Sequence, residues 1–483
     1  MSTGFSGRDF PPGFAFGAAT AAFQIEGAAW EDGRRDSIWD AFCRVPGAVI
    51  DGHDGAVACD HYHHYPADVA LMKDLGLTSY RFSISWARVV PDDVAVNPAG
   101  LAFYDRLVDS LLEAGIRPWP TLYHWDLPQA REELGGWPAR ETAERFTEYA
   151  LAVHGALGDR LGTWTTFNEP WCSSFLSYGA GAHAPGRMDH TAAVAAGHHL
   201  LLAHGLAASA LREAGADEVG ITLNLAPVRP LRPGDAGDQD AARRIDGQFN
   251  RFFLDPLFRG YYADDVRADL APFGLNEVVQ PGDLALIHGS ADFLGVNYYH
   301  GETVSTLSPA EVGREEQRQE APTTRPTRSP FPADDGIHWH PSNLPVTSMG
   351  WEVEPHGLTE LLERVHRDYS GPAGIPLYVT ENGAAFEDEV AADGAVHDAE
   401  RVAFLESHLD AILDAREAGV DVRGYFYWSL LDNFEWAWGY HKRFGLVRVD
   451  YETQQRTPKD SALAYRDIIA RALAGTVRGA SVR

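Results

Sequence analysis

Eight short apolar runs recur along the chain, and amphipathic stretches with helical period lie between most of them. This alternation favours parallel strands joined by right-handed crossovers. Eight such units predict a closed barrel rather than an open sheet, so we expect an α/β fold, a (β/α)8 TIM barrel. The candidate strands are Phe14–Phe16, Ser79–Ile84, Arg117–Leu122, Thr163–Phe167, Gly220–Leu223, Phe293–Val296, Leu377–Thr380 and Val422–Trp428.

The stretch Phe103–Glu113 illustrates the helical pattern, because Leu107, Leu111 and Leu112 are expected largely on one face. Gly115 follows it as a helix-ending residue. Barrels often exceed the usual length of one domain. We therefore expect residues 1–483 to form a single catalytic domain with long loops after the strands.

Two segments depart from this pattern. Residues 305–345 are polar and rich in Pro, Thr, Arg and Glu, with neither strand nor helical period. A structureless loop of this length in a compact domain is usually functional or disordered. The sequence leaves both readings open: a disordered excursion, or a loop that frames the substrate-binding mouth. Residues 474–483 are expected to form a flexible tail.

Composition excludes several classes of partner. The chain has 40 Lys and Arg against 69 Asp and Glu, a net charge of −29, which disfavours nucleic acid and anionic membrane surfaces. We expect no membrane span, because no apolar run of about 20 residues stands out, and no signal peptide. The sparse cysteines Cys43, Cys59 and Cys172 fit a reducing compartment. We expect a cytoplasmic monomer or homo-oligomer.

Polar and aromatic side chains lie in or just after the candidate strands, at the ends where such barrels carry their chemistry. Chance placement would scatter them over both ends of the barrel. We therefore expect them to converge on one rim. They are Gln24, Arg81, His124, Trp125, Asp126, Asn168, Glu169, Asn297, Tyr299, Glu381 and Trp428.

Two glutamates carry the strongest chemical signal. Glu169 lies in Thr166-Phe167-Asn168-Glu169-Pro170, and Glu381 lies in Thr380-Glu381-Asn382-Gly383. Two carboxylates at one site can break a glycosidic bond: one protonates the leaving oxygen, and the other attacks the sugar carbon or activates water. A cation such as Arg81 would favour the charged form of Glu381, whose charge would in turn raise the pKa of Glu169.

Tryptophans suggest what the rim binds. Sugars pack their C–H faces on aromatic rings, and their hydroxyls need paired donors and acceptors. Glu435 stands among large aromatic residues, where a carboxylate is costly to bury without a partner. The sequence therefore predicts sugar binding. The tryptophans near candidate rim loops are Trp125, Trp171, Trp351, Trp428, Trp436 and Trp438.

Taken together, these motifs resemble glycoside hydrolase family 1, in particular its β-glucosidases. The likeness spans roughly residues 10–470 and includes Phe16–Gly27, Arg81–Trp86 and Trp428–Trp436, in the family's order and spacing. The resemblance implies a retaining β-glucosidase that removes terminal nonreducing β-D-glucosyl residues from small glucosides and oligosaccharides. It implies double displacement through a covalent glycosyl-enzyme, without a cofactor or a metal.

The resemblance also implies roles for matching residues. Glu381 is expected to be the nucleophile and Glu169 the acid/base, with Arg81 and Tyr299 orienting the nucleophile. The expected substrate-binding residues are Gln24, His124, Trp125, Asn168, Asn297, Tyr299, Trp351, Trp428, Glu435, Trp436 and Phe444.

Other readings remain beside this one. A transglycosylase would use the same residues, whereas a non-catalytic sugar-binding barrel should have lost one carboxylate. Relatives that act on 6-phosphoglycosides share Lys442, but here Glu435 would repel a phosphate and Phe444 cannot donate to one. A metal site at Asp60, His61, His63 and His64 is not expected, because adjacent histidines cannot both face one ion from a helix.

Overall fold

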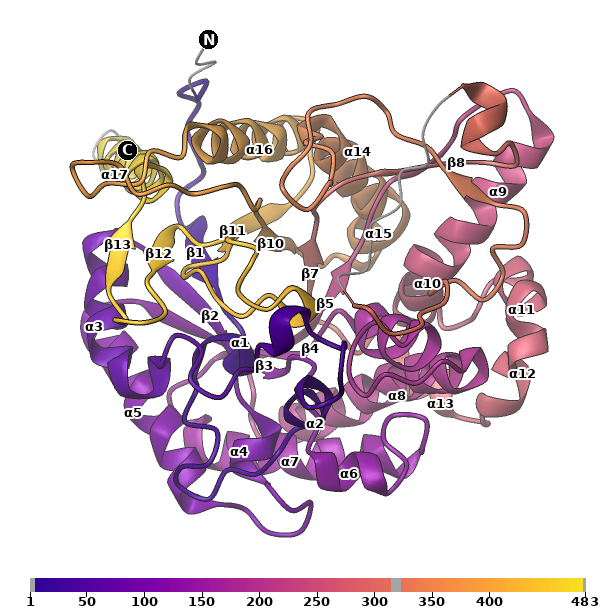
Figure 1. The fold of residues 1–483 in the computed structure, drawn as a ribbon, viewed down its shortest axis with the longest axis horizontal. Coiled ribbons are helices and arrows are strands. Elements are labelled where there is room, and N and C mark those ends of the chain that lie inside the picture. Colours follow the sequence, from indigo (N-terminus) through magenta and orange to yellow (C-terminus); the bar gives the residue numbers. More distant parts are fainter. Residues whose placement is uncertain (1–4, 314–322, 481–483) are drawn as a thin grey trace.

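The computed structural model describes residues 5–313 and 323–480, without the side chains of residues 475–480. Eight parallel strands form a closed barrel with helices around it (Figure 1). All eight predicted strands are confirmed, and most of them have ends that shift by a few residues. They are β1 (Ala15–Ala19), β2 (Ser79–Ser83), β3 (Arg117–Tyr123), β4 (Thr163–Asn168), β5 (Glu218–Asn224), β7 (Phe293–Asn297), β10 (Leu377–Asn382) and β11 (Val422–Trp428).

The first strand closes the barrel. Ala18 of β1 is in register with Tyr427 of β11 on one side and with Tyr80 of β2 on the other. The beginning and the end of the barrel therefore meet, and the loops that follow β1 and β11 are neighbours at the same rim.

Long helices follow most of the strands, and shorter helices fill the connection between β5 and β7. The long helices are α3 (His61–Asp74), α5 (Pro98–Ala114), α7 (Glu141–Leu157), α8 (His190–Glu213), α14 (Pro355–Val365), α16 (Ala399–Glu417) and α17 (Asp460–Ala480). The shorter ones are α9 (Ala236–Asp246), η3 (Gly247–Arg251), α10 (Phe252–Arg259), α11 (Asp264–Leu270), η4 (Ala271–Phe273), α12 (Leu275–Val278) and α13 (Asp283–Ile287).

Helix α5 shows why these sequences form these elements. The Asn97 side chain caps the backbone N–H of Ala99, and Gly115 ends the helix with a φ of 78°, which glycine adopts without strain. Leu107 and Leu111 are buried as predicted. Leu112 is 41% exposed, so its predicted place on the buried face is wrong. At 100° per residue, Leu112 lies one step beyond the stripe that faces the barrel.

Aromatic rings fill the interior of the barrel. Trp119 packs against Tyr378 and Phe426 with ring centroids 4.8 and 5.2 Å apart, and it donates a 3.0 Å hydrogen bond to Thr165. Side chains therefore fill the interior of the barrel below the rim. A Cβ on Gly17 would lie 2.4 Å from the Phe426 ring, so only glycine fits beside it.

The connections at the rim contain short helices and two small sheets. One sheet has the order β6-β8-β9 and the other pairs β12 with β13. These elements are α1 (Ala22–Ile25), α2 (Ile38–Cys43), η1 (Ile50–Gly52), α4 (Trp86–Val89), α6 (Gln129–Glu133), η2 (Cys172–Ala180), β6 (Val228–Pro230), β8 (Glu302–Ser305), η5 (Pro309–Val312), β9 (His338–Trp339), η7 (Trp436–Trp438), β12 (Val447–Val449) and β13 (Arg456–Pro458). Two further short helices, η6 (His366–Ser370) and α15 (Gly371–Ala373), continue α14 toward the start of β10.

The polar segment 305–345 has more structure than its sequence indicates. It contains η5 and β9, and the backbone N–H of Ala333 donates to Gln248 at 2.8 Å. Phe331 lies 5.3 Å from the ring of Trp171. Its described residues, 305–313 and 323–345, therefore pack over the loops of the rim, which favours the framing-loop reading for them. Residues 314–322 lie outside the described part of the chain.

Helix α8 corrects one expectation. Among the described helices, α8 is long and apolar enough, by length and composition, to cross a membrane. The expectation that the chain has no apolar run of about 20 residues is therefore wrong. However, 78% of its most apolar window is buried, and it packs against α7 and η2. Its apolar side chains therefore belong to the packing around the barrel.

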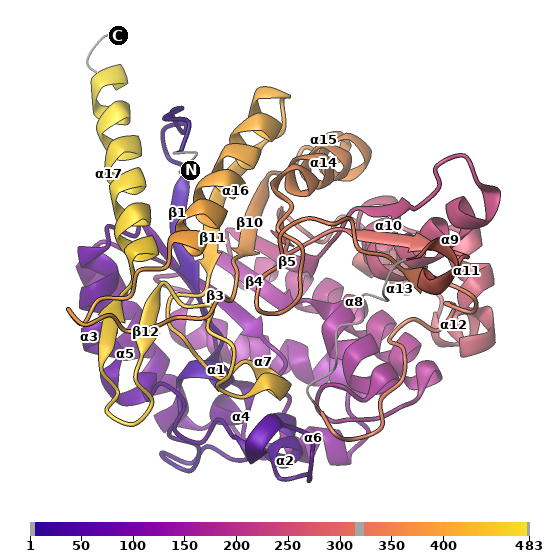
Figure 2. The same ribbon diagram turned by 45° about the horizontal axis from the view of Figure 1, so that its top comes forward.

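The N-terminal segment lies between α16 and the C-terminal helix α17, so the two ends of the described chain are near each other (Figure 2). Arg8 joins the N-terminal segment to α16 through Asp414 at 2.6 Å and Glu417 at 3.1 Å. The backbone of α17 is helical through Ala480, inside the predicted tail 474–483. The flexibility of that tail stays a prediction, and residues 481–483 lie outside the described part.

Candidate functional site

The two glutamates of the sequence motifs reach the same rim. Glu169 comes directly after β4, and Glu381 lies within β10. Both are buried, with 5% and 3% of their surface exposed. Arg81 donates to Oε1 of Glu381 at 2.6 Å, and the Tyr299 hydroxyl donates to Oε2 at 2.8 Å. Both oxygens of Glu381 are thus fixed by donors.

Glu169 is connected to Glu381 by a chain of hydrogen bonds. The second guanidinium nitrogen of Arg81 donates to Asn168 Oδ1 at 2.6 Å. Asn297 donates to the same oxygen at 3.0 Å and to Oε1 of Glu169 at 2.6 Å. Four strands, β2, β4, β7 and β10, supply these groups, so the barrel itself sets their geometry.

The electrostatic surroundings of the two carboxyl groups differ. Burial raises the pKa of Glu381, but the charge and hydrogen bond of Arg81 act against that rise. Burial also raises the pKa of Glu169, and the negative charge of Glu381 adds to it, to about 8. Glu381 is therefore the carboxyl that ionises first, and Glu169 is the one that keeps its proton near neutral pH.

Cys172 is a further neighbour of Glu169. Its thiol donates to Oε2 of Glu169 at 3.2 Å, and Asn224 donates to the sulfur at 3.5 Å. Burial and the charge of Glu169 raise the pKa of this thiol well above its usual range, so it stays protonated. Cys172 follows Glu169 by three residues in the sequence, but the sequence did not predict this contact.

Among the described residues, several buried polar atoms around the glutamates have no protein partner, and three of them are Gln24 Oε1, His124 Nδ1 and Glu435 Oε2. Gln24 is held by donating to Asn433 at 3.0 Å, and His124 lies 3.0 Å from the amide of Asn168. Buried polar groups are normally paired. These three are therefore suited to a ligand that carries several hydroxyls.

Aromatic rings form two groups at the rim. Trp436 packs against Trp125 and Trp39, with ring centroids 4.5 and 4.6 Å apart. His124 stacks on Trp428 at 5.7 Å and on Trp436 at 6.1 Å, so it extends this first group to Trp428. The second group contains Tyr299 and also Trp351 and Phe444, which lie 5.1 Å and 6.3 Å from it.

Three site residues adopt a left-handed backbone that non-glycine residues rarely take. The φ angles are 49° for Glu169, 75° for Trp125 and 50° for Trp436. Such conformations cost about 1–3 kcal/mol each and are held only where the surrounding structure determines them. They turn these side chains to the positions described above.

Comparison with known proteins shows the family of this chain. The model of glycosyl hydrolase family 1 matches residues 6–473. The chain belongs to this family. It is 51% identical to the thermostable β-glucosidase B of Thermobispora bispora (96% of this chain, 91% of that protein). It is 49% identical to a bifunctional β-D-glucosidase/β-D-fucosidase of Bifidobacterium breve (95% and 98%).

A solved structure gives the same result for this family 1 chain. The psychrophilic β-glucosidase of Micrococcus antarcticus matches with a TM-score of 0.93 and 55% identity, over 96% of this chain and 98% of that one. Together with the closed barrel, this confirms the predicted fold class.

The structure brings together the site residues that the sequence predicted for this family 1 member. One hydrogen-bond network contains Glu169, Glu381, Arg81, Asn168, Asn297 and Tyr299. The first aromatic group contains or adjoins Gln24, His124, Trp125, Trp428 and Trp436, and Glu435 lies beside Trp436. The second aromatic group contains Trp351 and Phe444. Lys442, by contrast, donates to the backbone oxygen of Ser348 at 2.5 Å.

Sequence reasoning missed four residues of the site. Thr380 donates to Asn297 Oδ1 at 2.8 Å and so fixes which way that amide points. Asn433 holds Gln24, and Trp39 and His183 pack beside Trp436. Thr380 and Asn433 stand in quoted motifs and could have been found there. Trp39 lies in α2 and His183 lies in the loop after η2, and neither residue stands in a quoted motif.

The histidines that sequence analysis considered for a metal do not face one point. His61 is buried and pairs with Asp68 at 2.8 Å, whereas His63 and His64 both pair with Asp60.

Proposed function

We propose that this family 1 chain is a retaining β-glucosidase that acts on neutral β-D-glucosides. The observation that carries the proposal is the asymmetry of two buried carboxyl groups. Glu381 accepts charged and hydroxyl donors from Arg81 and Tyr299, and Glu169 accepts from Asn297 and Cys172. One group suited to attack and one suited to carry a proton are what double displacement requires.

In the first half-reaction, ionised Glu381 attacks the anomeric carbon and Glu169 gives its proton to the leaving oxygen. The C–O bond to the leaving group breaks as the glycosyl ester to Glu381 forms. The charge of Glu381 keeps the pKa of Glu169 raised until that moment, so the proton is available at neutral pH.

In the second half-reaction, the ester has no negative charge. The pKa of Glu169 then falls, and the ionised carboxylate takes a proton from water as the water attacks the anomeric carbon. The sugar leaves with its original configuration, and Glu381 recovers its charge. One carboxyl group thereby serves first as acid and then as base.

The proposed sugar contacts use the unpartnered atoms. Glu435 Oε2 and Gln24 Oε1 accept from hydroxyls, and Trp428 packs against the apolar face of the ring. Asn168 Nδ2 has one hydrogen directed to His124, which leaves its second hydrogen for the 2-hydroxyl. That contact strengthens in the transition state of glycoside hydrolysis.

The test is hydrolysis of p-nitrophenyl β-D-glucoside by the wild type and by Glu381→Gly, with and without azide or formate. We expect the variant to lose nearly all activity and to recover it with the added anion, giving an α-glucosyl azide from azide. Glu169→Gly should instead give a β-glucosyl azide. Glu354→Gln, at a carboxyl group outside the network, is the control.

Near wild-type rates in Glu381→Gly, or an azide product of the same configuration from both variants, would contradict the proposed roles. Measuring glucose release against p-nitrophenol release distinguishes hydrolysis from transfer to an acceptor. A transglycosylase would release p-nitrophenol in excess of glucose. A non-catalytic sugar-binding barrel would release neither.

We propose β-D-fucosides as a second substrate class. The support is the Bifidobacterium breve relative named as bifunctional for glucosides and fucosides, which is 49% identical to this chain. Comparison of kcat/KM for p-nitrophenyl β-D-glucoside and β-D-fucoside tests this. Activity on the fucoside below about 1% of that on the glucoside would contradict it, because that ratio is a difference of about 2.7 kcal/mol in transition-state binding.

A further inference from the structure

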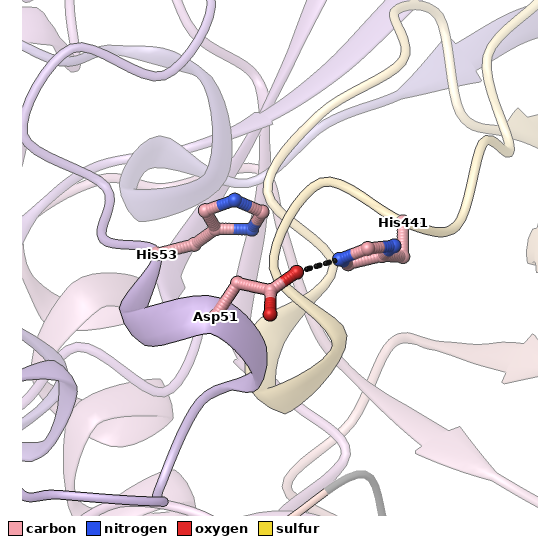
Figure 3. Close-up of side chains that lie close together, drawn as sticks. All are labelled: Asp51, His53 and His441. Atoms are coloured by element: carbon pink, nitrogen blue, oxygen red, sulfur yellow. Dashed lines mark hydrogen bonds and ion pairs between the residues drawn. The ribbon is translucent and has the colours of Figure 1, made fainter.

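Asp51, His53 and His441 come together at the rim although up to 390 residues separate them in the sequence. Oδ2 of Asp51 lies 2.7 Å from Nε2 of His441, and one ligand atom from each of the three residues lies within 4.8 Å of the others. Figure 3 shows the three side chains directed toward one another. Asp51 and His441 are 65% and 45% exposed, so an ion can reach them from solvent.

We propose that these three residues form a binding site for one divalent transition-metal ion, with Zn²⁺ as the expected occupant. Two imidazoles and one carboxylate are ligands that Zn²⁺ uses in proteins, commonly with water in the remaining position. Mg²⁺ and Ca²⁺ prefer oxygen ligands and are not expected to bind well to this set.

The present geometry needs only a small contraction to hold an ion. Ligand atoms around a tetrahedral Zn²⁺ with bonds of about 2.1 Å lie about 3.4 Å apart. The hydrogen bond between Asp51 and His441 would open slightly, and His53 would move closer. Nδ1 of His53 now accepts only a long hydrogen bond of 3.3 Å from the backbone N–H of Tyr440, which a metal bond can replace.

The site joins the two loops that meet where the barrel closes. Asp51 and His53 lie at η1, in the connection after β1, and His441 follows η7, in the connection after β11. A Cβ on Gly439 would lie 2.4 Å from His53 Nδ1, so the two loops already approach as closely as glycine permits. A bound ion would therefore act as a clamp between neighbouring loops.

The clamp would also stiffen part of the catalytic rim. The backbone from Glu435 to His441 is one compact turn, because Gly439 O accepts from the N–H of Glu435 at 2.7 Å and Trp438 O accepts from that of His441 at 3.1 Å. A metal bond to His441 would restrain the turn that carries Glu435 and Trp436. The metal site itself stands whether or not the proposed catalytic roles are correct.

A second exposed histidine provides a matched control. His397 is 55% exposed and lies between Asp460 at 2.8 Å and Asp393 at 3.5 Å, and within the described part of the chain no second histidine completes a metal-binding group with it. If a histidine paired with a carboxylate were enough to bind Zn²⁺, the ion would bind equally at His397 and at His441. The proposal predicts that only the loss of His441, His53 or Asp51 weakens binding.

The experiment titrates the full-length protein, without an affinity tag and after treatment with a chelator, with ZnCl₂ by calorimetry. We expect one tight site in the wild type and in His397→Ala. His441→Ala and Asp51→Asn should weaken it at least tenfold. Zn²⁺ should raise Tm and slow amide hydrogen exchange over residues 435–441 in the wild type and the control, but not in His441→Ala.

Equal titration of the wild type and His441→Ala would overturn the proposal, as would a wild type without a tight site. Retention of the wild-type Tm by the variants in the presence of chelator checks that they fold. If Asp51→Asn lost stability there, His53→Ala would take its place, because that change removes a ligand and leaves Asp51, with its φ of 54°, unaltered.

Discussion

Arg81 Nη1 lies 2.6 Å from Oε1 of Glu381, and the two side chains are 1% and 4% exposed. A buried ion pair of this kind does little for stability compared with an apolar pair, but loss of one partner leaves a buried charge alone. Because Arg81 also donates to Asn168, it orients both catalytic motifs at once.

Replacement of Arg81 by Met should reduce kcat by at least 100-fold. The lost cation raises the pKa of Glu381, so less of it is ionised, and the acid limb of the pH–rate profile moves to higher pH. Arg81→Lys keeps the charge but loses the two hydrogen bonds that the guanidinium makes to Glu381 and Asn168. Compared with Arg81→Met, it should therefore bring the acid limb back toward the wild-type pH more fully than it brings back kcat. Measurement of kcat and kcat/KM from pH 4 to 9 checks both statements.

A large loss of Tm in Arg81→Met would be compatible with this role, because the buried carboxylate is left unpaired. An unchanged acid limb in a folded Arg81→Met protein would not, since the charge of Arg81 would then have no effect on the ionisation of Glu381.

Glu435 makes stability depend on pH in a direction opposite to that of a salt-bridged acid. Burial, followed by the charges of Glu381 and Glu169, raises the pKa of Glu435 to about 8. A raised folded-state pKa means that the folded protein holds this proton more tightly than the unfolded chain. Its contribution is therefore full below the unfolded pKa and is lost as pH rises toward 8.

Glu435→Gln removes this dependence while keeping the shape of the side chain. We expect its Tm to exceed that of the wild type by several degrees at pH 9 and to differ little at pH 5. Its KM for glucosides should rise, because one hydroxyl acceptor is replaced. Parallel Tm curves for the two proteins between pH 5 and 9 would show that Glu435 does not titrate in this range.

Cys172 should tune the alkaline limb of activity. Its thiol donates to Glu169, which favours the ionised form and lowers the pKa of that carboxyl. Cys172→Ala should therefore raise the pKa of Glu169 and move the alkaline limb of kcat/KM upward by a fraction of a pH unit. Cys172→Ser, which keeps a donor, should move it less. Cys43→Ala, at a buried cysteine elsewhere, should leave the profile unchanged.

Two arginines that bind carboxylates should differ widely in their effect on stability. Arg401 is fully buried and pairs with Asp388 at 2.8 Å and Asp398 at 2.5 Å. Arg401→Met should lower the free energy of unfolding by about 3–5 kcal/mol. Arg8, which is 29% exposed, also contacts several carboxylates. Arg8→Met should cost about 1 kcal/mol or less, with a cost that shrinks as salt is added. Chemical denaturation at low and high salt measures both.

The strands were accessible from the sequence because buried parallel strands are short apolar runs, as in Val422–Trp428, which the structure reproduces without change. The apolar character of the long helix α8 was harder to predict, because its histidines and alanines interrupt the run of large apolar residues. The strand inside segment 305–345 was not accessible from the sequence, because β9 is only two residues long and is held by pairing with β8. Local sequence cannot show such pairing.

The sequence by itself determined the alternation that closes the barrel, and it placed Glu169 and Glu381 at strand ends that must share one rim. Contacts across the barrel were decided only by the tertiary structure. The donation of Asn297 to Glu169 depends on where β7 stands relative to β4, and the meeting of Asp51 with His441 depends on how β1 closes against β11. Periodicity indicates which face of an element is buried. Which side chains that face contacts depends on packing and on barrel closure, which bring together residues hundreds of positions apart.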